Sequence, residues 1–117
     1  MCFLNARLPC LSVNRNYNVH MQSLHIEWDQ KKNRANRKKH GVSFEEARTV
    51  FYDESAIQFY DPDHSDEEDR FILLGLSLKP QVLVVCDCFR ESETVVRIIS
   101  ARTADKDEDR EYWRQRK

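Results

Sequence analysis

The residues best suited to chemistry in this sequence are a run of cations that ends in a histidine. Between Gln30 and His40 there is no acidic residue but there are six basic ones, namely Lys31, Lys32, Arg34, Arg37, Lys38 and Lys39. Cations this close together repel one another, so the run favours an anionic partner, either a phosphate backbone or an acidic protein. The alternative is a solvated face without a ligand. His40 can transfer protons near neutral pH beside a bound phosphate, or it can simply complement a helix dipole.

Arginines in or beside predicted strands form the second group of candidates. Arg90 and Arg102 stand at strand ends, where a guanidinium can project from a rigid scaffold and fork onto phosphate oxygens. We expect these two arginines to converge on one phosphate. The alternative is that they form surface ion pairs with neighbouring acidic residues. Arg97 lies in mid-strand, where its apolar stem can also lie along the sheet.

The sequence carries no convincing metal site. Cys86 and Cys88 point to one face of a predicted strand, but the four histidines lack the spacing that would complete a set of zinc ligands. We interpret the cysteines as reduced core residues. The acidic run from Asp61 to Asp69 lacks the glycine and the ligand spacing of an EF-hand. We therefore predict that the protein uses no metal and no cofactor.

Length and charge distribution limit the class of protein. The 117 residues fit one domain, and the net charge of −1 hides a strong polarity, because Asp53 to Asp69 holds eight acidic residues and no Lys or Arg. No apolar stretch approaches the ~20 residues needed to cross a bilayer. The first twenty residues lack the unbroken apolar region of a signal peptide. We expect a cytoplasmic protein without membrane spans.

Hydrophobic periodicity and capping signals predict the elements that position these residues. A strand at 24–28 is followed by a helix from the cap Asp29 to Gly41, and a second helix begins at the capping box of Ser43 and Glu46 and ends near residue 52 or 53. Period-two patterns predict strands at 56–60, 70–78, 82–89 and 94–101, and Asp105 begins a last helix. The prediction is an α+β fold with a compact antiparallel meander, two N-terminal helices and one C-terminal helix, all on one face of the sheet. Residues 1–20 are expected to be a disordered extension of a domain at 21–117.

Several segments, taken together and in order, resemble the BrnT family of bacterial type II toxins. The most specific are K-H-G-V-S-F-E-E-A from Lys39 to Ala47 and R-I-I-S-A-R from Arg97 to Arg102. They are accompanied by Trp28-Asp29, Lys32-Asn33, Asp61-Pro62-Asp63-His64-Ser65 and Arg70-Phe71-Ile72. The resemblance extends over roughly residues 24 to 117. It implies a fold similar to RelE-type toxins, a ribonuclease activity that arrests translation, and a BrnA-like antitoxin whose DNA-binding domain represses the operon.

The resemblance also assigns roles to residues. The family's basic helix and histidine correspond to Lys38, Lys39 and His40, and its sheet arginines correspond to Arg90 and Arg102. The chain departs from the family pattern in two places, where Thr103-Ala104-Asp105 comes before the next cation and where acidic residues follow Arg90. Both departures make the expected RNA face less positive.

We therefore predict the toxin component of a type II toxin–antitoxin module, a metal-independent endoribonuclease. The 2′-hydroxyl of the RNA would attack the adjacent phosphorus, His40 would transfer the proton, and Arg90 and Arg102 would stabilise the phosphoryl charge. Substrate binding is expected from Lys38, Lys39, Arg70 and Arg97. The expected partners are RNA and a cognate antitoxin, with contact to operator DNA only through that antitoxin. The alternative is a non-catalytic subunit that binds an antitoxin-like partner or nucleic acid through its basic helix.

Overall fold

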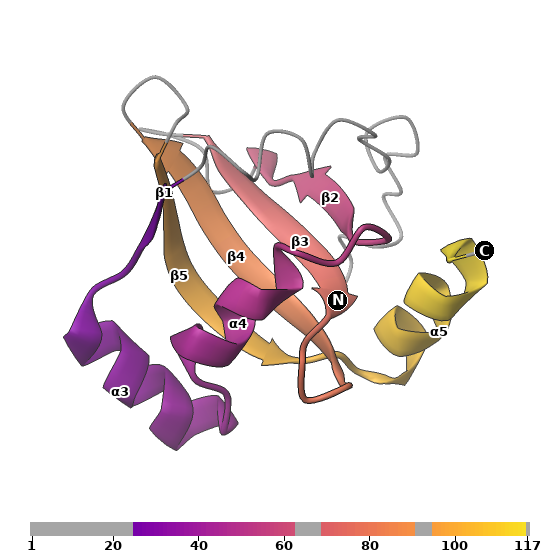
Figure 1. Cartoon of the computed structure of the whole chain (residues 1–117), viewed down its shortest axis with the longest axis horizontal. Coiled ribbons are helices and arrows are strands. Elements are labelled where there is room, and N and C mark those ends of the chain that lie inside the picture. The colour runs from indigo at the N-terminus through magenta and orange to yellow at the C-terminus, as the bar shows by residue number, and fades with distance from the viewer. Residues whose placement is uncertain (1–24, 63–68, 91–94, 117) are drawn as a thin grey trace.

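The computed structural model describes residues 25–62, 69–90 and 95–116 (Figure 1). The expected N-terminal extension, residues 1–20, lies outside these ranges. No helix in the described part of the chain is long and apolar enough to cross a membrane. The elements follow the predicted order: β1 (His25–Glu27), α3 (Gln30–His40), α4 (Phe44–Val50), β2 (Ile57–Tyr60), β3 (Arg70–Leu76), β4 (Val82–Arg90), β5 (Val95–Thr103) and α5 (Lys106–Gln115).

The five strands form one mostly antiparallel sheet in the order β1-β5-β4-β3-β2. Strands β2 to β5 make the predicted meander, each antiparallel to the next. The first strand joins the opposite edge and runs parallel to the last one, so that Glu27 lies beside Arg97. This parallel pairing brings α3, the element that follows β1, alongside β5.

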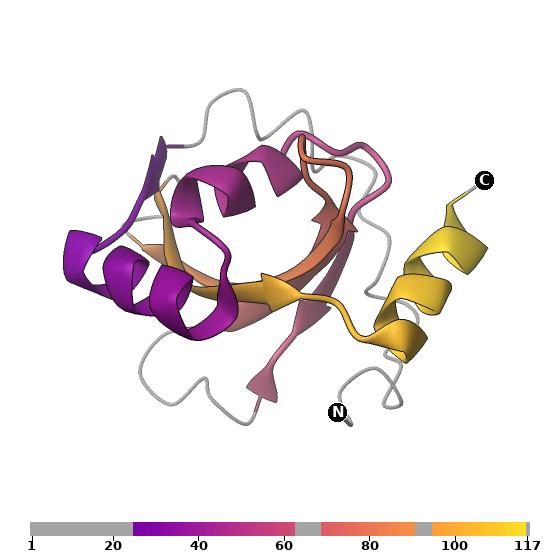
Figure 2. The ribbon, with the colours of Figure 1, turned by 90° about the horizontal axis from the view of Figure 1, so that it is seen from below.

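The helices cover both faces of the sheet. On one face α4 packs against a core that includes Leu73, Val85 and Ile98, and on the other face Tyr112 of α5 packs against Ile72, Leu74, Val82 and Val84. Seen from below, α5 lies well away from α3 and α4 (Figure 2). The expectation of helices on one face is therefore wrong. Its physical reason is visible in β3 and β4, whose consecutive apolar residues are typical of strands that are buried on both sides.

Capping interactions define the helix ends. The Asp29 carboxylate accepts a hydrogen bond from the backbone N–H of Lys31 at 2.8 Å, and Gly41 ends α3 with φ 74°, a left-handed conformation that glycine adopts without strain. Helix α4 begins at Ser43, whose hydroxyl accepts from the N–H of Glu46, and ends at Val50, earlier than predicted. The Glu46 carboxylate does not complete the predicted capping box, because it is bound elsewhere.

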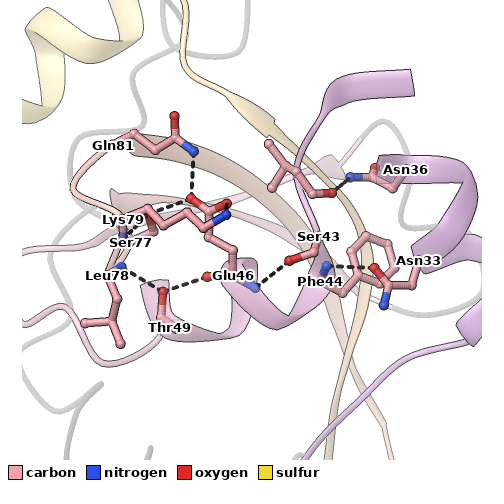
Figure 3. Close-up of polar contacts among 11 residues, drawn as sticks. Asn33, Asn36, Ser43, Phe44, Glu46, Thr49, Ser77, Leu78, Lys79 and Gln81 are labelled. Atoms are coloured by element: carbon pink, nitrogen blue, oxygen red, sulfur yellow. Dashed lines mark hydrogen bonds and ion pairs between the residues drawn. The ribbon is translucent and has the colours of Figure 1, made fainter. Parts of the chain in front are cut away.

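Glu46 instead ties α4 to the turn between β3 and β4 (Figure 3). Its buried carboxylate accepts hydrogen bonds from the Ser77 hydroxyl at 2.8 Å and from the Gln81 amide at 2.7 Å. The Thr49 hydroxyl adds a contact by accepting from the N–H of Leu78 at 3.0 Å. These polar contacts fix α4 over the sheet, and with it the loop at residues 41–43 through which α3 is connected.

Helix α5 is fixed by a tyrosine and by its own capping box. The fully buried Tyr112 donates its hydroxyl to Asp53 Oδ2 at 2.6 Å, beyond the C-terminal end of α4. Burial, and then the hydrogen bond to Asp53, raise the pKa of this tyrosine. At the other end of α5, Asp105 and Glu108 form the predicted capping box. Tyr112 thus attaches α5 to the rest of the domain, and the capping box defines where the helix begins.

Candidate nucleic-acid interface

The basic helix α3 is attached to the domain by two asparagines. Its sequence contains no large apolar residue, and its buried side chains are Asn33 and Asn36. The Asn33 side chain accepts from the N–H of Phe44 at 2.8 Å and donates to Glu45 Oε1 at 3.0 Å. Amide hydrogen bonds therefore attach α3 to the domain, whereas most surface helices are attached through an apolar stripe.

Asn36 joins α3 to the edge of the sheet. Its amide donates to the carbonyl oxygens of Val42 and Ala101, both at 2.8 Å, and its carbonyl accepts from the N–H of Ala101 at 3.1 Å. Strand β1 ends at Glu27, opposite Arg97, so it does not reach Ala101. The Asn36 side chain instead makes hydrogen bonds to the backbone N–H and C=O of Ala101 at this edge of β5. This two-point contact sets the position of α3 along β5.

The side of α3 that faces away from these asparagines is cationic. All six of its lysines and arginines are exposed, and none forms an ion pair with another residue that the structure describes. An open depression of about 460 Å³ lies on this surface, lined by Arg34, Arg37, Lys38 and Gly41. The predicted substrate-binding residues Lys38 and Lys39 both lie on this exposed surface.

His40 and Arg102 lie at the same end of the sheet. Asn36, one helical turn before His40, is bonded to Ala101, which comes directly before Arg102. Figures 1 and 2 both show the C-terminal end of α3 beside the end of β5. His40 is exposed. Ala101 lies in the core beneath α4, whereas Arg102, the next residue of β5, contacts Glu108 of α5 on the other face of the sheet.

The guanidinium of Arg102 is held by α5. Its two terminal nitrogens contact the two carboxylate oxygens of Glu108 at 2.7 and 2.8 Å, and the Glu108 side chain is 1% exposed whereas that of Arg102 is 32% exposed. The hydrogen bonds that Arg102 donates to the Glu108 carboxylate raise the pKa of the arginine. The arginine is therefore fixed in orientation, with part of its side chain still accessible to a ligand.

A second group of arginines lies at the opposite end of the sheet. Arg70, Cys88 and Arg97 are paired across three adjacent strands, so their side chains share one face, with the two arginine backbones about 10 Å apart. Arg97 forms an ion pair with Glu27 at 3.1 Å, and both side chains are about one-third exposed. The ion pair between Arg97 and Glu27 was not predicted from the sequence, where the surface-pair alternative was stated for Arg90 and Arg102.

Arg90 belongs to this second end, and not to the end that carries Arg102. In the β4–β5 ladder Arg102 pairs with Val84 and Arg90 pairs with Val95, six residues further along β4. At about 3.3 Å per residue this separates the two positions by about 20 Å. The expected convergence of Arg90 and Arg102 on one phosphate is therefore wrong.

The remaining candidates concern metal chemistry. Cys86 and Cys88 are free thiols, the first half-buried and the second buried, as expected for core cysteines. Burial raises the pKa of Cys86. Among residues 25–62, 69–90 and 95–116 there is no group of three His, Cys, Asp or Glu side chains that could hold a metal ion.

Comparison with known proteins gives this arrangement its context. Residues 28–108 match the family described as "Ribonuclease toxin, BrnT, of type II toxin-antitoxin system". The chain belongs to the BrnT family. Its fold is also similar to the 1.1 Å crystal structure of the Brucella abortus ribonuclease toxin BrnT, with a TM-score of 0.53 and 22% identity over 71% of this chain and 99% of that one. A search of curated proteins gave no match.

Membership of the BrnT family identifies the protein as a ribonuclease toxin of a type II system, which implies an RNA substrate and a cognate antitoxin. The α+β fold, with its mostly antiparallel five-stranded sheet, is also that of the solved BrnT toxin. Within this fold the C-terminal half of α3 is bonded to β5 next to Arg102, and the backbones of Arg70, Arg90 and Arg97 lie at the opposite end of the sheet.

Three residues that organise the interface were not predicted from the sequence. Asn33 and Asn36 stand three residues apart on α3, a spacing that places both on one face, and this was the available signal. Glu108 was recognised as part of a cap, but its second role as the partner of Arg102 depends on the packing of α5 against β5.

Proposed function

We propose that this BrnT toxin is a metal-independent endoribonuclease whose cleavage site lies at the C-terminal end of α3. The observation that carries the proposal is that His40 is an exposed imidazole among cations on a helix whose Asn36, one turn earlier, is bonded to Ala101, the residue before Arg102. Imidazole is the side chain best suited to proton transfer near neutral pH, and a fixed guanidinium can stabilise charge on phosphoryl oxygens.

The reaction needs only the RNA and these side chains. The 2′-oxygen attacks the adjacent phosphorus while its proton leaves to a base, a bond forms between the 2′-oxygen and phosphorus, and the bond from phosphorus to the 5′-oxygen breaks. The products are a 2′,3′-cyclic phosphate and a 5′-hydroxyl, which takes up one proton. We assign proton transfer to His40 and stabilisation of the phosphoryl charge to Arg102.

The other basic residues bind the RNA on either side of the cut. To Lys38 and Lys39, which precede His40 in the last turn of α3, we assign the binding of flanking phosphates. Because the β4–β5 register separates Arg90 from Arg102, we assign Arg90 to the second end of the sheet together with Arg70 and Arg97, where a longer RNA would be bound. As the substrate is RNA, we expect the toxin to act in the cytoplasm and to be neutralised there by a DNA-binding antitoxin.

The test is cleavage of RNA by the purified protein in the presence of EDTA. We expect 2′,3′-cyclic phosphate ends and a loss of about 10²-fold or more in rate for His40→Gln, a change at an exposed residue that should leave stability within about 0.5 kcal/mol. His25→Gln, at an exposed histidine of β1, is the matched control. Activity that disappears on chelation and returns with Mg²⁺, or a His40→Gln enzyme with full activity, would contradict the mechanism.

One observation favours the alternative of a non-catalytic subunit. The guanidinium of Arg102 already contacts both oxygens of Glu108, so a phosphate must share or displace that partner. A toxin-like subunit that only binds its antitoxin or nucleic acid would need no accessible arginine there. Wild-type protein that binds RNA tightly, yet leaves it intact at every pH between 5 and 9, would favour this alternative.

A further inference from the structure

We propose that the outward stripe of α3, formed by Lys31, Arg34 and Arg37 and ending at Lys38, is a phosphate-backbone binding site for RNA that continues from the cleavage site along the helix. The inference rests on the proposed function for the identity of the polyanion, and it extends the binding surface beyond Lys38 and Lys39. Its occupant is single-stranded RNA on its way to or from the cut.

The spacing of these residues places them on one side of the helix. Arg37, Lys38 and Gly41 come three, four and seven residues after Arg34, and together these four residues line the open depression on α3. Asn33, Asn36 and His40 follow a different stripe, of which the two asparagines face the domain. The cationic stripe therefore faces solvent while the asparagine stripe holds the helix in place.

The charge of the stripe is not neutralised by the described part of the protein. Two carboxylates border it, Asp29 at the start of α3 and Glu45 at the start of α4, and both are already bound through other groups. The hydrogen bond from Asn33 lowers the pKa of Glu45, and the charge of Arg37 contributes a smaller part. Four cations facing two committed carboxylates leave a net positive surface that attracts a polyanion.

The composition of the surface favours RNA over a protein partner. Protein interfaces are centred on aromatic and aliphatic side chains, whereas the only apolar residue on α3 is Ala35. Phosphate contacts need only cations that are held in a fixed position. The hydrogen bonds of Asn33 and Asn36 hold α3 in such a position. The open depression suits a flexible strand that lies across the helix.

The test measures binding without cleavage. The probe is a fluorescent 12-nucleotide 2′-O-methyl RNA, which has no free 2′-hydroxyl and so cannot be cut by the proposed reaction. For full-length Arg34→Gln/Arg37→Gln we expect roughly ten-fold weaker binding at physiological salt, and a slope of log affinity against log salt that is smaller by about 1.4, or 0.7 for each lost phosphate contact. On long, cleavable RNA the KM should rise while kcat is unchanged.

Two further variants make the result specific. Arg110→Gln/Arg114→Gln changes the same residue types and the same charge on the exposed side of α5, and it should bind the probe like wild type. Arg34→Lys/Arg37→Lys keeps the charge and should restore most of the affinity. Equal losses in the α3 and α5 variants would overturn the site, because total charge would then explain binding.

Unchanged RNA binding by Arg34→Gln/Arg37→Gln would also overturn the proposal, and a simultaneous loss of antitoxin affinity would assign the stripe to the protein partner. The proposed function fails separately. Wild-type protein that cuts no RNA, while the α3 variant still loses affinity for the uncleavable probe, would contradict the ribonuclease mechanism and leave the binding site standing.

Discussion

The Arg102 guanidinium and the Glu108 carboxylate form a two-point ion pair that joins the end of β5 to the first turn of α5, with N···O distances of 2.7 and 2.8 Å. Glu108 Oε1 also accepts the backbone N–H of Asp105 at 2.9 Å, so one carboxylate completes a helix cap and orients an arginine. Arg102 is therefore both a structural residue and the charge-stabilising group in our mechanism. These two roles need separate tests.

Removing Arg102 alone should destabilise the fold. In Arg102→Ala the 1% exposed carboxylate of Glu108 loses its cation, and we expect the free energy of unfolding to fall by about 3 kcal/mol. This is the low end of the range for buried pairs, because Arg102 itself is about one-third exposed. Urea unfolding of the purified variant measures the change. Loss of toxicity by Arg102→Ala cannot by itself show a catalytic role.

The double variant Arg102→Gln/Glu108→Gln separates the two roles. The glutamines keep the groups that can hydrogen-bond and remove both charges, so the cost in stability should be less than half that of Arg102→Ala. If Arg102 stabilises the phosphoryl charge, this folded variant should still lose RNA cleavage by about 10²-fold. A double variant with wild-type cleavage would remove Arg102 from the site.

Asn36 offers a prediction about how α3 is attached. Asn36→Ala removes three hydrogen bonds and leaves the buried N–H and C=O of Ala101 without this partner, so we expect a loss of about 2 to 3 kcal/mol in the free energy of unfolding. Lys32→Ala, at an exposed position of the same helix, should change it by less than about 0.5 kcal/mol. Similar unfolding midpoints for the two variants would contradict the polar attachment.

Local signals in the sequence predicted the elements, because each has its own start and stop chemistry. The cap at Asp29, the glycine after His40 and the box at Asp105 all lie where expected, and the meander follows from short turns. The side of the sheet covered by α5 was predicted wrongly. The continuous apolar residues of β3 and β4 indicate that both faces of the sheet are buried. Helix α5 covers the second face although most of its residues are charged.

The candidate site was less predictable because register and packing decide which residues meet. Arg90 and Arg102 both stand at strand ends in the sequence, but antiparallel pairing places those ends about 20 Å apart. Conversely, Glu46 and Ser43 have the spacing of a capping box, yet Ser77 and Gln81 bind the Glu46 carboxylate from 31 and 35 residues away. Partners so far apart in the chain cannot be predicted from the spacing of neighbouring residues.

The N-terminal residues offer a prediction that the fold does not test. A chain that starts at Met21 should unfold at the same temperature as the full chain, because the first twenty residues show no hydrophobic period. Thermal unfolding of the two purified proteins measures this. A midpoint lower by several degrees would show that the extension packs on the domain, because ~1 kcal/mol shifts a domain of this size by roughly 4 °C.

Asp87 leads to a prediction about pH. It is 1% exposed in the middle of β4 and pairs across the ladder with Phe71 and Ile98. Neither of its carboxylate oxygens has a hydrogen-bond partner among the residues that the structure describes. Burial raises the pKa of this carboxyl well above its usual value. The native protein therefore keeps a proton that the unfolded chain releases near pH 4.

The sign of the effect follows from proton counting. Above pH 4 the native state binds one more proton at Asp87 than the unfolded state does, so this residue makes the free energy of unfolding fall as pH rises to its native pKa, by at most about 1.4 kcal/mol per pH unit. Asp87→Asn cannot titrate and should lack this decline. Urea unfolding of both proteins from pH 4 to pH 8 should therefore show Asp87→Asn gaining stability relative to wild type with increasing pH. Parallel stability profiles would mean that the carboxyl ionises as readily in the native state as in the unfolded chain.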